Sequence, residues 1–164
     1  MNSSKKKHIF MVIVVLSLLV VFPLKSEAKT SKYNAKKIAS EKYDNRWGIK
    51  KISQKDVEIL AKIVYLESGN QGDKGEQAVI ETIFNRVAHK RFPNTIRKVL
   101  SQKNQFSTWR RLGRGKMRTQ ELRNIYKVLS GDTNILSKKV VYFSVGPMNR
   151  KVELHYKNHY FCRY

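Results

Sequence analysis

The chain has 164 residues, a formal net charge of +22 and a single cysteine, Cys162. Its length allows one domain, and one cysteine excludes an intramolecular disulfide, so the domain depends on its apolar core for stability. So large a charge says nothing about the fold, but it indicates anionic partners: nucleic acid, anionic lipid or the acidic polymers of a cell wall.

Residues 1–28 have the features of a signal peptide. Lys5, Lys6 and Lys7 precede an apolar run from Ile9 to Phe22, and Ser26-Glu27-Ala28 offers small residues at the two positions that a signal peptidase reads. The alternative is an uncleaved membrane anchor, but the run is shorter than the roughly 20 residues that a bilayer span needs. In both cases the remainder of the chain is expected outside the membrane.

The charge left after cleavage is still high. Residues 1–28 contain four lysines and one glutamate, a net +3, so +19 remains from Lys29 onward. Export disfavours nucleic acid as the partner, and the basic residues are spread to Arg163 rather than gathered on one helix. This pattern favours diffuse attraction to anionic wall polymers, although an effect on solubility alone also explains it.

Residues 29–53 are polar and lysine-rich, which predicts a basic N-terminal arm or tether, with Trp47 as the residue that docks it onto a domain spanning 54–164. Ser53-Gln54-Lys55-Asp56 resembles a capping box and predicts a helix that ends near Gly69. A second helix is expected from Asp73 or Lys74 to Ala88. It is apolar around much of its circumference and therefore central.

The sequence patterns that indicate helices and strands are weaker in the second half of the domain. A short helix is expected over 95–100, a flexible basic loop around Gly113 and Gly115, and a helix capped by Thr119 and ended by Gly131. Residues 140–144 predict a strand with which the tail, 152–161, can pair. The fold class is thus α+β, mostly helical, with a short strand region near the C-terminus.

Glu67 is the first candidate for chemistry. It follows Leu60 and Val64 at helical spacing, so it continues the apolar face of its own helix. Burial raises the pKa of a carboxyl group, which suits a general acid that works near neutral pH. The alternative is a structural carboxylate, satisfied by backbone N–H groups or by Arg86. We interpret Asn85 and Arg86 as an internal polar brace rather than as ligands.

No second carboxylate shows the buried spacing of Glu67. Asp56, Glu58, Asp73 and Glu76 stand near helix starts, where negative charge is favourable. Glu81 is expected to line a polar cleft or to face solvent, and Glu121, Asp132 and Glu153 lie in surface-like contexts. A typical glycosidase uses two carboxylates. The sequence therefore predicts a site with one.

Other catalytic classes have little support. The sequence has no G-x-S-x-G, H-E-x-x-H, Walker or dinucleotide-binding motif. Cys162 with His155 and His159 matches no standard zinc spacing and supplies only three ligands. We therefore expect neither a metal nor another cofactor.

Several separated motifs, taken in order, resemble one family. They are Ile63-Val64-Tyr65-Leu66-Glu67-Ser68-Gly69, Gly75-Glu76-Gln77-Ala78-Val79, Phe84-Asn85-Arg86-Val87, Phe92-Pro93-Asn94-Thr95-Ile96, Gln105-Phe106-Ser107, Val141-Tyr142-Phe143 and Asn158-His159-Tyr160-Phe161. In order and spacing this set resembles the catalytic domain of the spore cortex-lytic, SleB-type cell wall hydrolases. The resemblance covers residues 56–162.

The resemblance implies a small lysozyme-like domain with lytic transglycosylase activity on peptidoglycan and with Glu67 as the catalytic glutamate. Four polar or aromatic members of the motifs are expected along the sugar cleft: Gln105, Ser107, Tyr142 and His159. Strand packing is the alternative for Tyr142, and a hydrogen-bonded tail residue for His159. The chain departs from the family where Gln71 replaces a frequent acidic residue and Glu76 a glutamine. A hydrolytic muramidase or glucosaminidase, or a non-catalytic wall-binding module, is the alternative function.

Overall fold

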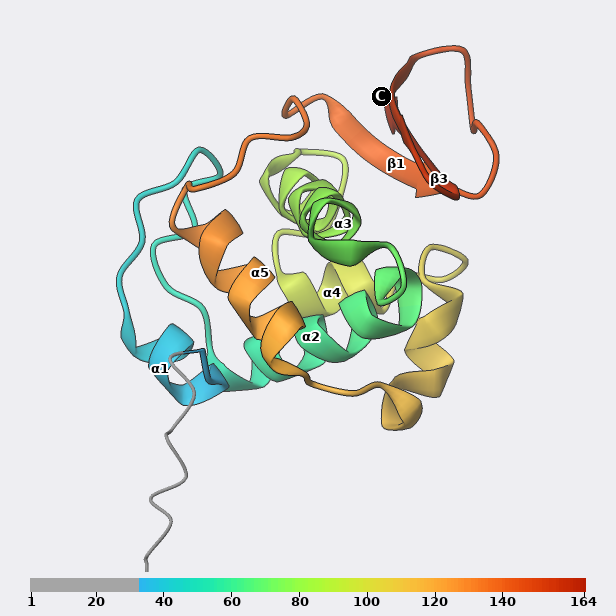
Figure 1. Cartoon of the computed structure of the whole chain (residues 1–164). Helices are drawn as coiled ribbons and strands as arrows, with labels where there is room; N and C mark the ends of the chain where they lie inside the picture. The colour runs from blue at the N-terminus through green and yellow to red at the C-terminus, as the bar shows by residue number, and fades with distance from the viewer. Residues whose placement is uncertain (1–32) are drawn as a thin grey trace, which may run out of the picture.

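The fold consists of helices packed around one central helix, with a small sheet at one side (Figure 1). The computed structural model describes residues 33–164, so the predicted signal peptide lies outside it. The elements in order are α1 (Ala35–Ser40), α2 (Gln54–Ser68), α3 (Gly72–Ala88), α4 (Ile96–Leu100), the 3-10 helix η1 (Ser107–Arg114), α5 (Thr119–Leu129), β1 (Val140–Ser144), β2 (Val152–Tyr156) and β3 (His159–Arg163). The α+β class is confirmed.

Helix α2 begins at the predicted cap. The side chain of Ser53 accepts a hydrogen bond from the backbone N–H of Asp56 at 3.0 Å, which satisfies one of the free donors at the helix start. The predicted apolar face, Val57, Leu60, Ala61 and Val64, is fully buried. The helix therefore points its last turn, which carries Glu67, toward the edge of the core.

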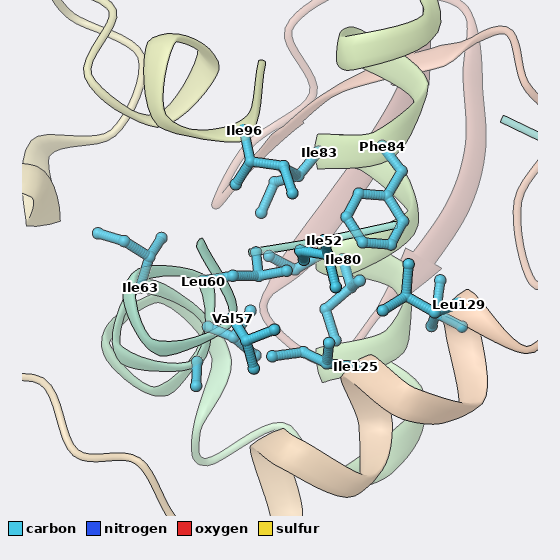
Figure 2. Close-up of a cluster of buried hydrophobic side chains, with 14 of the residues drawn as sticks. Ile52, Val57, Leu60, Ile63, Ile80, Ile83, Phe84, Ile96, Ile125 and Leu129 are labelled. Carbon is cyan, nitrogen blue, oxygen red and sulfur yellow. The ribbon is translucent and has the colours of Figure 1, made fainter. Parts of the chain in front are cut away.

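Helix α3 is the central helix that its composition predicts. Every residue from Gly75 to Arg86 is buried, and α3 contacts α2, α4, α5 and β1. Figure 2 shows apolar side chains of three helices meeting at the core: Leu60 of α2, Ile80 and Phe84 of α3, and Ile125 and Leu129 of α5. Because apolar burial is the main stabilising term, this three-helix contact holds the site's scaffold together.

The three strands form an antiparallel sheet in the order β1-β3-β2. The predicted pairing of the tail with 140–144 is confirmed for β3, where Phe143 lies opposite Phe161. Strand β2 pairs with β3 alone. The turn between β2 and β3 contains Lys157, whose φ of 49° is left-handed, and Asn158. This turn carries Asn158 and His159 toward the end of α2.

The N-terminal segment is more ordered than its composition suggests. It contains α1, and Trp47 docks on α3 as expected: its indole Nε1 donates to Oδ1 of Asn85 at 2.7 Å, and its ring meets Phe84 edge-on at 5.4 Å between centroids. Arg46 also pairs with Glu81 at 2.9 Å. Residues 33–53 thus pack against the domain rather than hanging free of it.

Two local predictions were wrong. The expected flexible loop around Gly113 is η1 as far as Arg114, because distant contacts hold it. The cap of α5 is Arg118 rather than Thr119, and Glu121 accepts from the Arg118 backbone N–H at 2.9 Å. Within residues 33–164, no helix is both long and apolar enough to cross a bilayer.

Candidate active site

Glu67 lies in the last turn of α2 and opens onto a cleft of about 460 Å³. Because it continues the apolar face of α2, its side chain is half-buried between the core and this cleft. The cleft is built from the end of α2, the start of α5, the residue after β1 and the β2–β3 turn. Its lining residues are Tyr65, Leu66, Glu67, Gly69, Asn70, Gln71, Arg118, Val145, Asn158 and His159.

Thr108 of η1 is the direct partner of Glu67. The threonine is buried, and its Oγ1 donates a hydrogen bond to Oε1 of the glutamate. Burial raises the pKa of Glu67 above its usual value, against the opposing effects of the Thr108 bond and of the positive charges of Arg111 and Arg86. Burial thus favours the protonated form that can donate a proton, and the hydrogen bond and positive charges stabilise the carboxylate that forms afterwards.

Three other glutamates are more deeply buried than Glu67, which corrects the expectation from sequence. Glu76, Glu81 and Glu121 have no exposed surface. Glu81 neither lines a cleft nor faces solvent. It pairs with Arg46 and accepts from Thr133 Oγ1 and the backbone N–H groups of Ile135 and Leu136. These bonds tie the N-terminal segment and the 132–137 loop to α3, so Glu81 is structural.

Glu76 and Glu121 belong to a buried polar network between α3 and α5. Oε2 of Glu76 accepts from Asn124 at 2.8 Å and Oε1 from Gln120 at 2.8 Å, while Arg118 pairs with Glu121 and, at 3.5 Å, with Glu76. Burial, together with the charge of Glu121, raises the pKa of Glu76 to about 7. Neither carboxylate lines the cleft, so Glu67 is the one acidic residue among the residues that do.

Arg118 connects this network to the cleft wall. Its Nη2 donates to the carbonyl of Gly69 at 3.1 Å, and its guanidinium carbon lies 4.7 Å from the centroid of the Tyr65 ring. Tyr65 and Gly69 flank Glu67 along the chain. The buried charges therefore fix the backbone that presents the glutamate.

The structure brings His159 into the cleft with Glu67. His159 is buried, its Nδ1 has no hydrogen-bond partner, and burial lowers its pKa, which favours the neutral ring. Its ring contacts Phe143 edge-on at 5.4 Å between centroids. A buried ring nitrogen without a partner at a cleft wall is a hydrogen-bonding group available to a ligand.

The other three predicted residues lie outside this cleft. Gln105 and Ser107 line a separate groove of about 530 Å³, formed by residues 101–107, 109 and 110 before and at the start of η1. Tyr142 lines neither space. Its ring stacks with Tyr164 at 6.2 Å and meets Phe92 edge-on at 6.4 Å, which supports the alternative interpretation as strand packing.

Asn85 and Arg86 form the internal brace that we expected. Asn85 Nδ2 donates to the carbonyls of Ser137 and Val140, and Arg86 Nε donates to the carbonyl of Val141 at 2.6 Å. Burial lowers the pKa of Arg86 to about 10, although Tyr142 and Glu67 oppose that effect. The brace joins α3 to β1 and keeps a cation near Glu67.

Sequence reasoning missed Gln71, Thr108 and Arg118. Gln71 is buried at the cleft, and its Oε1 has no partner while its Nε2 donates to Asn70. Gln71 lies beyond the end of α2, at the N-cap of α3, so helical spacing from Glu67 does not place it. The usable signal is its motif position, where the resembling family frequently has an acidic residue. Thr108 and Arg118 reach the cleft only through tertiary contacts. No cluster of three His, Cys, Asp or Glu side chains suited to a metal ion occurs among residues 33–164, and Cys162 is buried in β3.

Comparisons with known proteins identify the family and the fold. The model of the cell wall hydrolase family matches residues 70–162, a span that begins just after Glu67. No curated protein matches the sequence.

Two solved structures share the fold. The catalytic domain of the germination-specific lytic transglycosylase SleB from Bacillus anthracis is 22% identical, with a TM-score of 0.60 over 68% of this chain and 97% of that one. The catalytic domain of the Bacillus cereus SleB protein is also 22% identical, with a TM-score of 0.58 over 68% of this chain and 91% of that one. The family and the fold implied by the sequence motifs are thereby confirmed.

Proposed function

The chain belongs to the cell wall hydrolase family, and from this premise we propose that it is a lytic transglycosylase that cleaves the glycan strands of peptidoglycan with Glu67 as its acid and base. The observation that carries the proposal is the lone carboxyl group of the cleft. Glu67 is the one acidic residue that lines it, and its pKa is raised by burial. The related fold of SleB, described as a lytic transglycosylase, supports the same reaction class.

One carboxyl group is sufficient when the substrate supplies the nucleophile. Protonated Glu67 gives its proton to the glycosidic oxygen between N-acetylmuramic acid and N-acetylglucosamine, and the bond from that oxygen to the muramic acid C1 breaks. The resulting carboxylate then takes the proton of the muramic acid 6-hydroxyl, whose oxygen bonds to C1 and closes a 1,6-anhydro ring. Glu67 is protonated again at the end of the cycle.

The surroundings of Glu67 suit both halves of this cycle. Burial favours the protonated form that must donate first. Thr108 Oγ1–H and the positive charges of Arg111 and Arg86 favour the carboxylate that is left behind. A residue that acts first as an acid and then as a base needs both forms to be accessible near the working pH.

Gln71 and His159 are the proposed substrate contacts within the cleft. Each is buried, lines the space beside Glu67 and has a polar atom without a partner, Oε1 of Gln71 and Nδ1 of His159. The hydroxyl and acetamido groups of an amino sugar supply the missing bonds. Gln105 and Ser107 contact the wall polymer only from the neighbouring groove, and Tyr142 supports β1 rather than the sugar.

The proposed place of action is the cell wall, outside the membrane. Residues 1–28 have the pattern of an export signal, and the net charge of +19 from Lys29 onward attracts the protein to anionic wall polymers. Nucleic acid is not among the proposed partners, and the membrane is a partner only through an uncleaved signal segment.

The deciding experiment is digestion of purified peptidoglycan by the mature protein, followed by mass spectrometry. The proposal predicts 1,6-anhydromuropeptides and a falling turbidity of the wall suspension. Products with reducing ends only would instead establish a muramidase or glucosaminidase. Salt-sensitive adsorption without any loss of turbidity would establish a non-catalytic wall-binding module.

A further inference from the structure

The positive charge of this chain is concentrated in one stretch, although basic residues occur throughout. No aspartate or glutamate lies between Glu81 and Glu121, and that stretch contains eleven lysines and arginines. It spans the second half of α3, α4, η1 and the start of α5. Charge in this region is compensated only by carboxylates from elsewhere in the fold.

The basic groove, which we define as the hollow of about 530 Å³ lined by residues 101–107, 109 and 110, lies within this stretch. Lys103 and Arg110 line it together with Trp109 and the amide side chains of Gln102, Asn104 and Gln105. Within residues 33–164, neither Lys103 nor Arg110 has a carboxylate within salt-bridge distance. Arg97 adds a third cation, 5.8 Å from the centroid of the Trp109 ring.

The residues that line the basic groove indicate more about its ligand than a negative charge. Oε1 of Gln102 is covered from solvent and has no hydrogen-bond partner, so it needs a donor. Trp109 offers a half-exposed ring for an aliphatic or planar group. Cations, an unpaired acceptor and an aromatic ring together suit a short acidic peptide, which supplies carboxylates and amide N–H donors at once.

The basic groove adjoins the catalytic cleft through η1. Ser107 lines the groove, and the next residue, Thr108, donates its hydrogen bond to Glu67. Arg110 lines the groove, and its neighbour Arg111 is close enough to act on Glu67 electrostatically. In Figure 1 this segment, in gold, runs beside the C-terminal end of α2. A group held in the groove is therefore held near the scissile bond.

We infer that the basic groove binds the acidic peptide stem that peptidoglycan carries on its muramic acid residues, so that the enzyme prefers stem-bearing strands over naked glycan. This inference rests on the proposed function and names the substrate class for it. A polyol-phosphate polymer matches the charge, and its hydroxyl groups can donate to Gln102, so it is the competing occupant that the test has to exclude. A strand whose muramic acid has lost its peptide keeps only the lactyl carboxylate next to the sugar ring, and it has none of the peptide's carboxylates or amide N–H donors for Lys103, Arg110 and Gln102.

The test compares two substrates and two double variants. Strands with peptide stems and strands stripped by an amidase are digested by the wild type, by Lys103→Ala/Arg110→Ala, and by Lys36→Ala/Lys37→Ala. The last pair removes the same charge from exposed positions on α1 that line neither the cleft nor the groove. We expect the groove variant to lose about tenfold in kcat/KM on stem-bearing strands and much less on stripped strands, because one charge-assisted hydrogen bond is worth about that factor. The α1 variant should match the wild type on both.

Equal losses for the two double variants would overturn the inference, since charge alone would then explain them. A groove-variant loss that appears only with walls that retain polyol-phosphate polymers would overturn it in favour of that polymer. A second measurement separates failure of the inference from failure of the proposed function: calorimetric titration of Glu67→Gln with a soluble acidic stem peptide. Binding that Lys103→Ala/Arg110→Ala abolishes supports the groove even if no lysis is seen, and absence of binding contradicts it.

Discussion

Thr108 Oγ1 donates a hydrogen bond to Oε1 of Glu67, and this contact joins two residues that lie 41 positions apart in the sequence. It is a tertiary contact that holds η1 against the end of α2. Burial raises the pKa of Glu67, and the hydrogen bond from Thr108 lowers it. The bond therefore helps to set the pH at which Glu67 can act as an acid.

Removal of that bond should change the pH profile as well as the rate. In Thr108→Ala we expect kcat to fall by about tenfold, since a hydrogen bond to a charged group is lost. Activity needs protonated Glu67, so it declines as pH rises through the pKa of that group. Without the opposing Thr108 bond the pKa rises further, and the alkaline limb should move to higher pH. Thr108→Ser keeps the hydroxyl and should restore the wild-type limb. If the alkaline limb of the Thr108→Ala profile coincides with that of the wild type, Thr108 does not influence the pKa of Glu67.

Glu67→Gln tests the acid itself. The amide keeps the shape of the side chain but can neither deliver nor recover a proton, so activity should fall on the order of 10² or more. Stability should be unchanged or slightly higher, because an amide costs less to bury than a charge. Adsorption to walls should persist, since the basic surface is untouched. Thermal melting and a sedimentation assay provide those two controls. Near wild-type lysis in this variant, with loss in Glu76→Gln, would transfer the role to Glu76.

The sequence predicts the features that depend on neighbours along the chain. Ser53 caps α2 and the apolar face of α2 is buried as its spacing indicates, because cap and face are set within a few residues. The same local logic places Glu67 at the end of that face. The order of the motifs identifies the family, which the family model and the solved structures confirm.

Features that depend on distant partners could not be predicted in this way. Glu81 and Glu121 have the local context of surface residues, yet Arg46 and Arg118 let them be fully buried. Thr108 has no periodicity that points to Glu67. Gln105 and Ser107 are close to Thr108 in sequence, but the turn into η1 directs them to another groove. A charged side chain is buried at acceptable cost only where a partner compensates its charge, and the fold determines which residue is that partner.

Gln71 is expected to show opposite effects on stability and on substrate binding. Gln71→Leu is a similar-sized change that removes a buried Oε1 without a partner, at the loss of the Nε2 hydrogen bond to the exposed Asn70. Because the exposed Asn70 can bond to water instead, the free energy of unfolding should rise by up to about 1 kcal/mol. The same change removes an acceptor from the cleft, so KM should rise about tenfold with a smaller effect on kcat. Gln54→Leu, at an exposed position of α2, is the matched control. A stabilised variant with unchanged KM would show that Gln71 makes no contact with the sugar.

Glu76 should make the domain less stable as the solution becomes more alkaline. Burial and the charge of Glu121 raise its pKa in the folded state to about 7, whereas in the unfolded chain it returns to 4.5. Between these values the folded protein binds more protons than the unfolded one, so the free energy of unfolding falls with rising pH. The decrease contributed by this group is on the order of 2–3 kcal/mol across that window.

Glu76→Gln should therefore flatten the pH dependence of unfolding between about 4.5 and 7 and leave the variant more stable than the wild type above pH 7. Gln120 can rotate its amide to accept a hydrogen bond from the amide introduced at position 76, so the contacts with α5 survive. Denaturant unfolding at a series of pH values measures the effect. Glu58→Gln, on the solvent side of α2, is the control that should follow the wild-type curve. If Glu76→Gln follows the same slope as the wild type, Glu76 is not the group whose titration produces the pH dependence.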